Sequence, residues 1–212
     1  RMALRGDAPP GEGAEIGVKF RPLGANLLLT AALFDTTQQN VLTADPTNVI
    51  FSVQTGEVRV RGIELEARGN VTRELEIIGA YSKLDPKVTK SNDGFVGNYL
   101  PNTALQQAAL WTKYTFYDGP VAGLGIGGGV RYVGQSYGDD ANTILIPDYT
   151  LFDATISFDF KYLRPDLKGW SAQINATNLT NKYYVASCLT GLPYCGLGSA
   201  RTVLGTVKYA WN

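Results

Sequence analysis

Hydrophobic and polar residues alternate along the segment from Tyr149 to Phe160. One set of alternate positions is mostly apolar, and the set between them is mostly polar. Side chains of a β-strand point to opposite faces with a period of two, so this segment predicts a strand with one apolar face. The apolar set is Thr150, Phe152, Ala154, Ile156, Phe158 and Phe160, and the other set is Leu151, Asp153, Thr155, Ser157 and Asp159.

The same alternation recurs about nine times along the chain. Ile63, Leu65 and Ala67, for example, form an apolar row that alternates with charged residues. The predicted strands lie within 15–20, 27–33, 63–68, 77–81, 110–116, 124–132, 149–160, 170–177 and 202–211. A β-strand crosses a membrane with about 9–11 residues, so the repeat matches that length.

The connections between these strands alternate between short turns and long loops. The long loops are rich in Pro, Asp, Asn and Gly and cover 43–55, 85–103, 137–147 and 187–199. Aromatic residues gather near the short turns, at Phe20, Phe116, Phe160, Trp170, Tyr209 and Trp211. This loop asymmetry and an interfacial aromatic girdle are typical of outer-membrane barrels. The sequence therefore predicts an all-β fold, a transmembrane antiparallel up-and-down β-barrel.

In such a barrel the apolar rows face lipid and the polar rows face the lumen. The predicted lipid-facing residues are Phe152, Ile156, Phe158, Ile174, Val203 and Val207, and the predicted lumenal residues are Asp153, Ser157, Gln173 and Asn175. The charged residues of the strands fall on polar rows, at Glu64, Glu66, Lys113 and Arg131. A basic side chain at the lipid midplane costs about 2–4 kcal/mol, which favours this orientation. A soluble sandwich or lipocalin-like barrel, with apolar rows inward, shows the same alternation and stays open on that criterion alone.

Composition narrows the classes of function. The chain has 212 residues with 19 basic and 19 acidic side chains, so it lacks the positive charge that nucleic-acid binding requires. It has no histidine, which excludes Ser–His and Cys–His nucleophile pairs and His-ligated metal centres. We therefore expect no enzyme. No apolar stretch is long enough for a membrane helix, and the opening segment lacks a secretory signal, so we expect a mature piece or an internal fragment.

Residues 123–128 formally match the dinucleotide-binding pattern G-x-G-x-x-G. That motif requires a helix after the glycines, whereas Val130 to Val133 continue the strand pattern. We therefore interpret these glycines as part of a barrel strand, where they would give space for another domain to approach the wall closely.

Three motifs carry a specific resemblance to a known family. They are GEVRVRGIELEA at 56–67, GVRYVGQSYGD at 129–139 and NLTNKYYVASC at 178–188. In this order they resemble strand and loop motifs of TonB-dependent siderophore receptors. The Cys188 and Cys195 pair and the following GLGSARTV resemble the hydroxamate branch, which includes ferrichrome receptors. The likeness runs over essentially the whole chain.

The resemblance implies a bacterial outer-membrane receptor with an N-terminal plug, a TonB box and a barrel of about 22 strands. Residues 1–212 would then supply the C-terminal portion of that barrel, about its last nine strands. Implied partners are a ferric siderophore, TonB through a region outside this chain, and outer-membrane lipid and lipopolysaccharide. Iron would stay inside the siderophore, so neither a cofactor nor a protein metal ligand is expected. The family usually ends on an aromatic residue, whereas this chain adds Asn212.

In the oxidising cell envelope Cys188 and Cys195 are expected to form a disulfide within a long loop. Free thiols are the main alternative, and a metal site would lack further ligands. Aromatic loop residues suit a binding vestibule for a compact amphipathic chelate. The candidate siderophore-binding residues are Phe95, Tyr99, Tyr137, Leu189 and Tyr194. Leu189 departs from the aromatic contact that ferrichrome receptors carry at this place.

The function predicted is TonB-energised import of a ferric siderophore of the hydroxamate type. The missing histidine chemistry counts against catalysis. Three other functions stay open on the sequence. One is a passive porin-type channel, and the second is a barrel-based enzyme that uses paired loop acids such as Asp139 and Asp140. The third is a structural or phage-receptor role, which can coexist with transport. A packing role between loops is the alternative for each aromatic candidate.

Overall fold

The computed structural model describes residues 11–24, 26–48, 50–190, 192 and 194–211. The expectations on residues 1–10 and Asn212 lie outside the described residues. No helix within the described part is long and apolar enough to cross a membrane. The elements are β1 (Gly11–Phe20), β2 (Asn26–Ala44), β3 (Ser52–Asn70), β4 (Leu75–Lys90), β5 (Gln106–Thr115), β6 (Leu124–Val133), β7 (Ser136–Tyr137), β8 (Leu145–Ile146), β9 (Tyr149–Asp159), the 3₁₀ turns η1 (Phe160–Tyr162) and η2 (Pro165–Leu167), β10 (Trp170–Thr177), β11 (Val185–Cys188), β12 (Cys195–Leu197) and β13 (Thr202–Tyr209).

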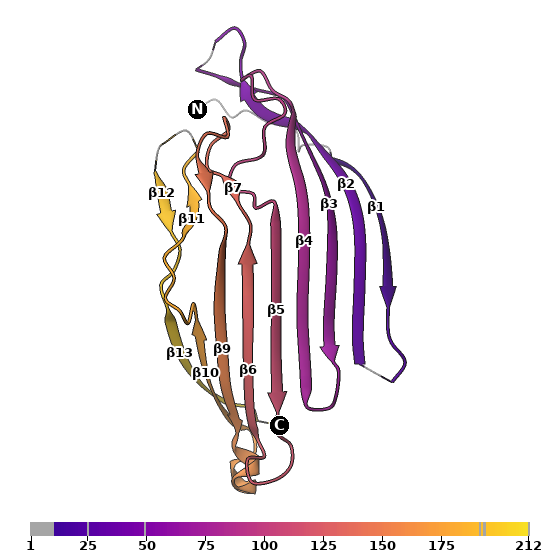
Figure 1. Cartoon of the computed structure of the whole chain (residues 1–212), viewed down its shortest axis with the longest axis vertical. Coiled ribbons are helices and arrows are strands. Elements are labelled where there is room, and N and C mark those ends of the chain that lie inside the picture. The colour runs from indigo at the N-terminus through magenta and orange to yellow at the C-terminus, as the bar shows by residue number, and fades with distance from the viewer. Residues whose placement is uncertain (1–10, 25, 49, 191, 193, 212) are drawn as a thin grey trace.

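Nine strands form one antiparallel sheet in the order β1-β2-β3-β4-β5-β6-β9-β10-β13. Each neighbour is also the next strand of that sheet along the chain, so the topology is up-and-down. The other strands form two small hairpins, β7 with β8 and β11 with β12. Figure 1 shows the short turns at one end of the curved sheet and both hairpins at the other. The predicted antiparallel all-β architecture of about nine strands is confirmed.

The register places the predicted apolar rows on one face of the sheet. Residues that pair directly across antiparallel strands point to the same face. Ile16 pairs with Leu33, and Leu33 pairs with Ile63. Toward the other edge, Ile156 pairs with Ile174. The apolar rows therefore share one face of the sheet from β1 to β13, and on β4 this face also carries Lys83, which pairs with Ile63.

Burial along β9 shows which face is convex. Phe152 and Ile156 are 46% and 45% exposed, whereas Leu151 and Thr155 on the opposite face are 1% and 5% exposed. Side chains crowd on the concave side of a curved sheet, so the polar row lines the inside. Five of the predicted lipid-facing residues are exposed and one, Phe158, is half-buried, the exposed ones being Phe152, Ile156, Ile174, Val203 and Val207. The apolar rows thus lie outward. This contradicts the soluble alternative, a sandwich or lipocalin-like barrel in which the apolar rows would face inward.

Charged side chains of the wall follow the predicted polar rows. The register puts these on the inner face: Glu64, Glu66, Lys113 and Arg131. On the outer face the apolar row of Leu33 and Ile63 is followed, toward the long loops, by the pair of Asp35 with Arg61. Arg61 forms an ion pair with Asp35 at 3.2 Å. This change from apolar to charged residues marks the loop-end limit of the lipid-facing band.

The first strands extend farther than the sequence pattern predicts. β2 and β3 each have 19 residues and β4 has 16, against about 9–11 needed to cross a membrane. The predicted loops at 43–55 and 85–103 are therefore partly strand. Both faces of β2 are polar beyond the lipid band, which hides the alternation there. A β-bulge at Val41, beside Asn40 with a φ of 57°, twists this extension.

Aromatic side chains cluster at the short-turn end, as predicted for an interfacial girdle. The neighbouring pairs are Tyr114 with Phe116, Phe158 with Phe160 and Trp170 with Tyr209, with ring centroids 4.9, 5.5 and 4.9 Å apart. Trp170 and Tyr209 are paired across β10 and β13 on the outer face. Amphipathic rings at this level suit the boundary between lipid and water.

Candidate ligand-binding mouth

Three long connections meet at the loop end of the sheet (Figure 1). They are residues 91–105 between β4 and β5, residues 134–148 with the β7–β8 hairpin, and residues 178–201 with the β11–β12 hairpin. We call this cluster the mouth. Asn102 joins all three, because its N–H donates to the Tyr137 carbonyl at 2.6 Å and its side chain is bonded to Cys188. Tyr137, Leu189 and Tyr194 therefore lie at the same end of the sheet, as the sequence predicts.

Two of the five candidate residues pack against each other. The rings of Tyr99 and Tyr137 are stacked with centroids 5.7 Å apart and planes 6° from parallel. The Lys87 ammonium lies 5.3 Å from the centroid of the Tyr99 ring. Asn142 fixes the Tyr99 backbone, accepting from its N–H at 2.7 Å and donating to its carbonyl at 2.9 Å. These contacts make a rigid aromatic wall, in which packing between loops accounts for part of what both tyrosines do.

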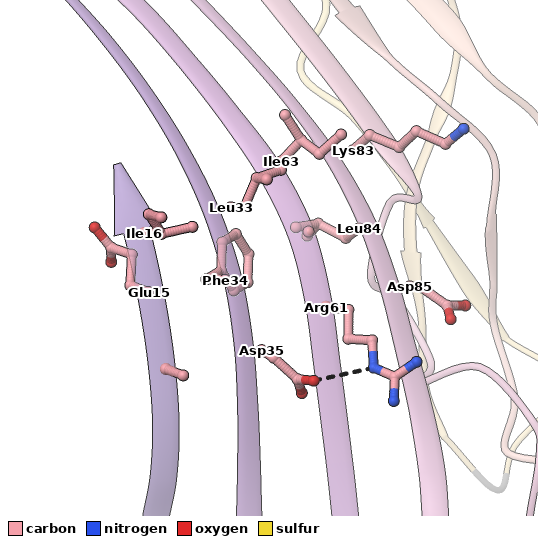
Figure 2. Close-up of a pocket in the computed structure, with 12 residues that line it drawn as sticks. Glu15, Ile16, Leu33, Phe34, Asp35, Arg61, Ile63, Lys83, Leu84 and Asp85 are labelled. Atoms are coloured by element: carbon pink, nitrogen blue, oxygen red, sulfur yellow. Dashed lines mark hydrogen bonds and ion pairs between the residues drawn. The ribbon is translucent and has the colours of Figure 1, made fainter. Parts of the chain in front are cut away.

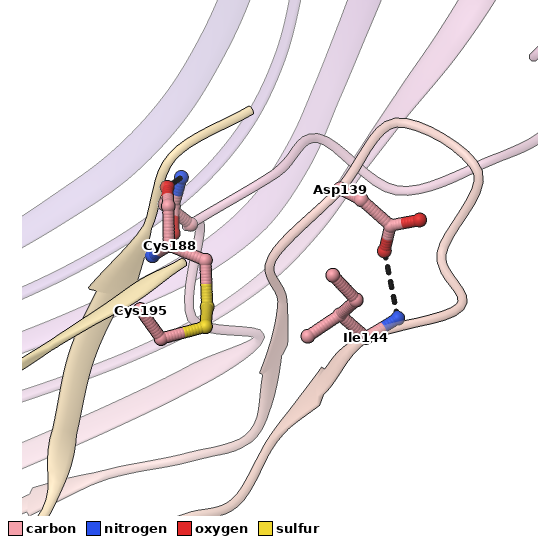
Figure 3. The surroundings of a disulfide bond; sticks show 5 residues. Asp139, Ile144, Cys188 and Cys195 are labelled. Atoms are coloured by element: carbon pink, nitrogen blue, oxygen red, sulfur yellow. Dashed lines mark hydrogen bonds between the residues drawn. A yellow bond between two sulfur atoms is a disulfide. The ribbon is translucent and has the colours of Figure 1, made fainter. Parts of the chain in front are cut away.

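Two other candidates lie on the outside of the β11–β12 hairpin. Cys188 and Cys195 form a disulfide across this hairpin, which Figure 3 shows beside the β7–β8 loop. The Leu189 N–H donates to the Tyr194 carbonyl at 2.8 Å, which closes the tip. Leu189 and Tyr194 are 60% and 65% exposed, whereas Cys188 is 5% exposed. The hairpin thus buries Cys188 against the mouth, leaves Cys195 exposed, and presents an apolar and an aromatic side chain.

The fifth candidate, Phe95, lies in the turn after β4. It is half-buried, and its carbonyl accepts from the Asn98 N–H at 3.1 Å. The Asn98 side chain donates to the Asp140 carbonyl at 2.8 Å, so this turn also contacts the β7–β8 loop. Phe95 therefore belongs to the rim of the mouth and not to the stacked tyrosine pair.

Asparagines organise the mouth, and sequence reasoning missed them. Every non-glycine residue with positive φ in the described part is an asparagine, namely Asn40, Asn102, Asn142, Asn178 and Asn181. Asparagine tolerates the left-handed region because its short amide can hydrogen-bond to nearby backbone. Two of these amides, Asn102 and Asn142, bind backbone groups of another loop, whereas Asn178 and Asn181 bind backbone groups within the last long loop. Isolated asparagines in long loops were the available signal, and it is a weak one.

The acidic pair of the β7–β8 loop has a structural explanation. Asp139 accepts from the Thr143 hydroxyl at 2.7 Å. It also accepts from the Ile144 N–H at 2.7 Å (Figure 3). Burial raises the Asp139 pKa, but these hydrogen bonds outweigh it and hold the pKa below its ordinary value. Burial, then repulsion from Asp139 and Asp93, raises the Asp140 pKa. Because the Asp139 oxygens are both engaged in turn formation, the pair does not resemble an acid–base couple aimed at a ligand.

An ion pair on the lumenal face of the wall binds the last long loop of the mouth. Arg131 donates to Asp153 from Nε at 2.6 Å and from Nη2 at 3.0 Å, across β6 and β9. Asp153 also accepts from the Asn178 N–H at 2.9 Å. The Asn178 side chain donates to the carbonyls of Lys182 and Ser199, each at 3.0 Å. A charged pair of the wall therefore anchors both ends of the last long loop.

The predicted lumenal residues of β10 form a hydrogen-bonded polar surface. Gln173 donates to Asn175 at 2.7 Å and to the Thr155 hydroxyl at 3.1 Å, and Thr155 donates to Asn175 at 2.8 Å. The register places Ser157 opposite Gln173 on the same face. Neighbouring strands thus satisfy one another's polar groups along the inside of the wall.

The glycines of β6 serve a different purpose from the one expected. A Cβ at Gly129 would lie 2.5 Å from Trp111 Cε3, and a Cβ at Gly127 would lie 3.2 Å from Trp111 Cζ2. At Gly125 the space is taken by Lys113 and Ser157. Side chains of the adjacent strands therefore fill the room above these glycines. The interpretation of this strand as space for another domain is wrong at these positions, because period-two patterning does not report cross-strand overlap.

A shallow groove lies beside the charged boundary of the outer band, on β1 to β4 (Figure 2). It is lined on the outer rows by Ile16, Leu33, Ile63 and Lys83, with Asp35 and Arg61 at one end. These residues belong to the lipid-facing surface and to its polar limit. In the described part of the chain, no three His, Cys, Asp or Glu residues gather as a metal-ion site.

A family model described as TonB dependent receptor-like, beta-barrel, matches residues 11–179. That range covers eight of the nine strands of the main sheet. The strand outside it is β13, at the edge of the sheet. The chain belongs to the TonB-dependent receptor family. Its apolar outer face is accordingly the lipid-facing surface of a barrel in the bacterial outer membrane.

Relatives in this receptor family match over most of the chain. The ferrichrome outer membrane transporter/phage receptor of Escherichia coli strain K12 is 36% identical over 199 residues, covering 94% of this chain and 26% of its own length. The ferrioxamine receptor of Yersinia enterocolitica is 37% identical, with 93% of this chain and 27% of its own length covered. The chain therefore spans about a quarter of the length of these receptors.

A solved receptor of the family has the same arrangement of strands. The siderophore receptor PiuA from Acinetobacter baumannii superimposes with a TM-score of 0.79 at 31% identity. The match covers 94% of this chain and 28% of that one. The open sheet of this chain thus corresponds to one sector of a TonB-dependent receptor barrel.

Proposed function

We propose that residues 1–212 form the C-terminal part of the barrel of an outer-membrane receptor that imports a ferric siderophore with energy delivered through TonB. The observation that carries this proposal is the mouth, where three loops of a family barrel converge. Leu189 is 60% exposed there and Tyr194 is 65% exposed. A ferric siderophore is compact and amphipathic, so apolar and aromatic side chains beside polar loop groups suit it.

The proposed ligand is a hydroxamate siderophore. Support comes from the names of the relatives, which are receptors for ferrichrome and ferrioxamine. In this proposal the iron stays enclosed by the siderophore, so the protein contributes no metal ligand and needs no cofactor. TonB would act through a plug region that is not part of this chain. Membrane lipid and lipopolysaccharide would surround the outer face.

Within the mouth we assign different roles to the five candidate residues. Leu189 and Tyr194 would contact the chelate directly, because both are exposed on the disulfide-bonded hairpin. Tyr99 and Tyr137 would form the wall behind it, since their rings are stacked. Phe95 would line the rim. A few anchor residues commonly supply most of the binding free energy, and the residues around them exclude water.

Binding and uptake by the complete receptor test this proposal. Cells that express the receptor would be supplied with radioactive iron as ferrichrome, as ferrioxamine B or as a tris-catecholate chelate, with and without TonB. We expect saturable binding of at least one hydroxamate chelate and uptake that requires TonB. A passive channel would instead give uptake that does not saturate and does not require TonB, and this result would exclude the receptor function.

A further inference from the structure

Asn102 binds the backbone of Cys188 as a strand residue would. Its Nδ2 donates to the Cys188 carbonyl at 2.9 Å, and its Oδ1 accepts from the Cys188 N–H at 2.7 Å. One amide side chain therefore satisfies both backbone groups of a cysteine that lies 86 residues away in sequence. Asn102 has a φ of 55°, and its own N–H donates to the Tyr137 carbonyl at 2.6 Å.

The β7–β8 loop forms the other side of this contact. A Cβ at Gly138 would lie 2.7 Å from Cys188 Sγ and 2.8 Å from Cys188 Cβ. The backbone at Gly138 therefore packs directly on the disulfide, and a side chain there would displace it. Cys188 is held between Asn102 on one loop and Gly138 on another.

The segment that carries this disulfide needs such support. The disulfide hairpin, residues 185–197, has a short ladder in which Val185 pairs with Leu197, Ser187 with Gly196 and Cys188 with Cys195. It forms a separate two-stranded sheet outside the nine-stranded one. A two-stranded hairpin on its own is marginally stable in water. Contacts with the neighbouring loops must therefore set its orientation.

We propose that Asn102 is a positioning residue for ligand capture, which fixes the disulfide hairpin on the mouth so that Leu189 and Tyr194 face the incoming chelate. This inference rests on the proposed function. Asn102 itself touches the hairpin backbone and acts on the ligand through it. Pre-ordering a binding loop strengthens binding because less conformational freedom is lost when the ligand arrives.

The test uses Asn102→Gly in the complete receptor. Glycine removes the amide and keeps the left-handed backbone accessible, so loss of the clamp is separated from backbone strain. We expect hydrogen exchange of the hairpin amides to become about tenfold faster, because two hydrogen bonds are lost. Asn102→Asp keeps the acceptor for the Cys188 N–H and loses the donor for the Cys188 carbonyl. Hydrogen exchange of the hairpin amides in this variant should therefore be faster than in wild type and slower than in Asn102→Gly.

The matched control is Asn40→Gly. Asn40 has a similar φ of 57° but lies at the bulge of β2, outside the mouth. This variant should leave hairpin exchange and chelate binding at the wild-type level. If Asn40→Gly accelerated hairpin exchange as much as Asn102→Gly, the effect would be a general loosening of the receptor, and the clamp would be refuted.

Binding of ferrichrome and ferrioxamine B then decides the positioning role. Asn102→Gly should weaken binding about tenfold by faster dissociation, and adding Tyr194→Ala should cost less in this background than in wild type, because residues that act together are not additive. Faster hairpin exchange with unchanged dissociation, or full additivity, would overturn the positioning role alone. Failure of the wild-type receptor to bind any tested chelate would overturn the proposed function, and the positioning role with it.

Discussion

The wall of the sheet and the mouth above it are held together by different contacts. In the wall, backbone ladders join every neighbouring pair of strands, and side chains decide mainly which face meets lipid. In the mouth, single polar side chains bind backbone groups: Asn102 and Asn142 bind the backbone of other loops, and Asp139 binds the backbone of its own loop. The wall therefore depends on a repeated pattern, whereas the mouth depends on individual residues.

This difference predicts opposite sensitivities. Substitutions in the wall should matter according to the face on which they fall, because lipid rejects charge and the lumen accepts it. Substitutions in the mouth should change local order while the sheet stays folded, since loops open in units smaller than the whole protein. Each of the following experiments, on the complete receptor, tests one side of that comparison.

The largest effect is expected for a charge on the outer face. Ile174 is 51% exposed on that face and pairs with Ile156 in the middle of β10. Ile174→Lys should destabilise the barrel by about 2–4 kcal/mol, because the lysine meets hydrocarbon. Denaturant unfolding of the receptor in lipid vesicles measures this loss.

The control is Leu204→Lys, which places the same charge on the inner face. Leu204 pairs with Asn175, at nearly the same level of the sheet. We expect a loss of less than about 1 kcal/mol, because a lumenal lysine stays hydrated. Equal losses in the two variants would contradict the assignment of the faces.

The second experiment removes the disulfide by Cys188→Ser with Cys195→Ser. Closing so short a loop contributes about 2–3 kcal/mol by the chain-entropy estimate, and this should appear as faster hydrogen exchange within residues 185–197. The denaturant midpoint of the barrel should not change, because its stability rests on the nine-stranded sheet. Unfolding of the whole barrel on removal of the bond would show that wall and mouth are not separate units.

The same contrast explains what the sequence predicts and what it does not. The apolar rows of all nine strands, and the inward position of Lys113 and Arg131, follow from period-two alternation. The extension of β2 to Ala44 does not follow, because outside lipid neither face has to be apolar.

In the mouth the sequence predicts which loops meet but not how they are held. The up-and-down strand order fixes the end of the sheet at which each loop lies. The sequence alone therefore places Tyr137 and Leu189 at the same end. The Tyr99–Tyr137 stack and the Asn102 contact with Cys188 depend on loop conformations that no local pattern encodes. The roles of the five candidate residues in siderophore binding stay predictions.

The third experiment tests cross-strand packing in the wall with Gly129→Ala. Its methyl group would lie 2.5 Å from Trp111 Cε3, so the indole must move. Overpacking of this kind costs about 1–3 kcal/mol, which denaturant unfolding should detect. Gly128→Ala on the outer face is the control, since its Cβ meets the Asp153 carbonyl oxygen at an ordinary 3.7 Å. If both variants were as stable as wild type, Trp111 would not require the glycine.

The fourth experiment separates the exposed aromatic from the stacked one. Tyr194→Ala should weaken binding of a hydroxamate chelate by about 1–2 kcal/mol if the ring is an anchor, with no change in loop exchange. Tyr137→Ala should instead speed exchange around Tyr99, because the stack is lost. Equilibrium binding and hydrogen exchange measure the two outcomes. Unaltered affinity in both variants would leave these aromatics as loop packing.

The smallest effect concerns the pH dependence of the β7–β8 loop. Burial, then repulsion from Asp139 and Asp93, raises the pKa of Asp140, so the folded loop binds its proton more tightly than the unfolded loop does. Stability from Asp140 is therefore full below the ordinary aspartate pKa and is lost as pH rises through the raised value. Asp139, whose pKa is lowered, contributes in the opposite sense, with stability lost as pH falls through its folded pKa.

Asp140→Asn should therefore stabilise this loop slightly at neutral pH, whereas Asp139→Asn should destabilise it by weakening the bonds from Thr143 and Ile144. Hydrogen exchange of residues 138–146, corrected for the intrinsic effect of pH, measures both. Barrel unfolding should not change in either variant, because the loop lies outside the nine-stranded sheet. A loop that became less ordered in Asp140→Asn at neutral pH would show that the Asp140 charge supports the mouth, and that repulsion is not what governs it.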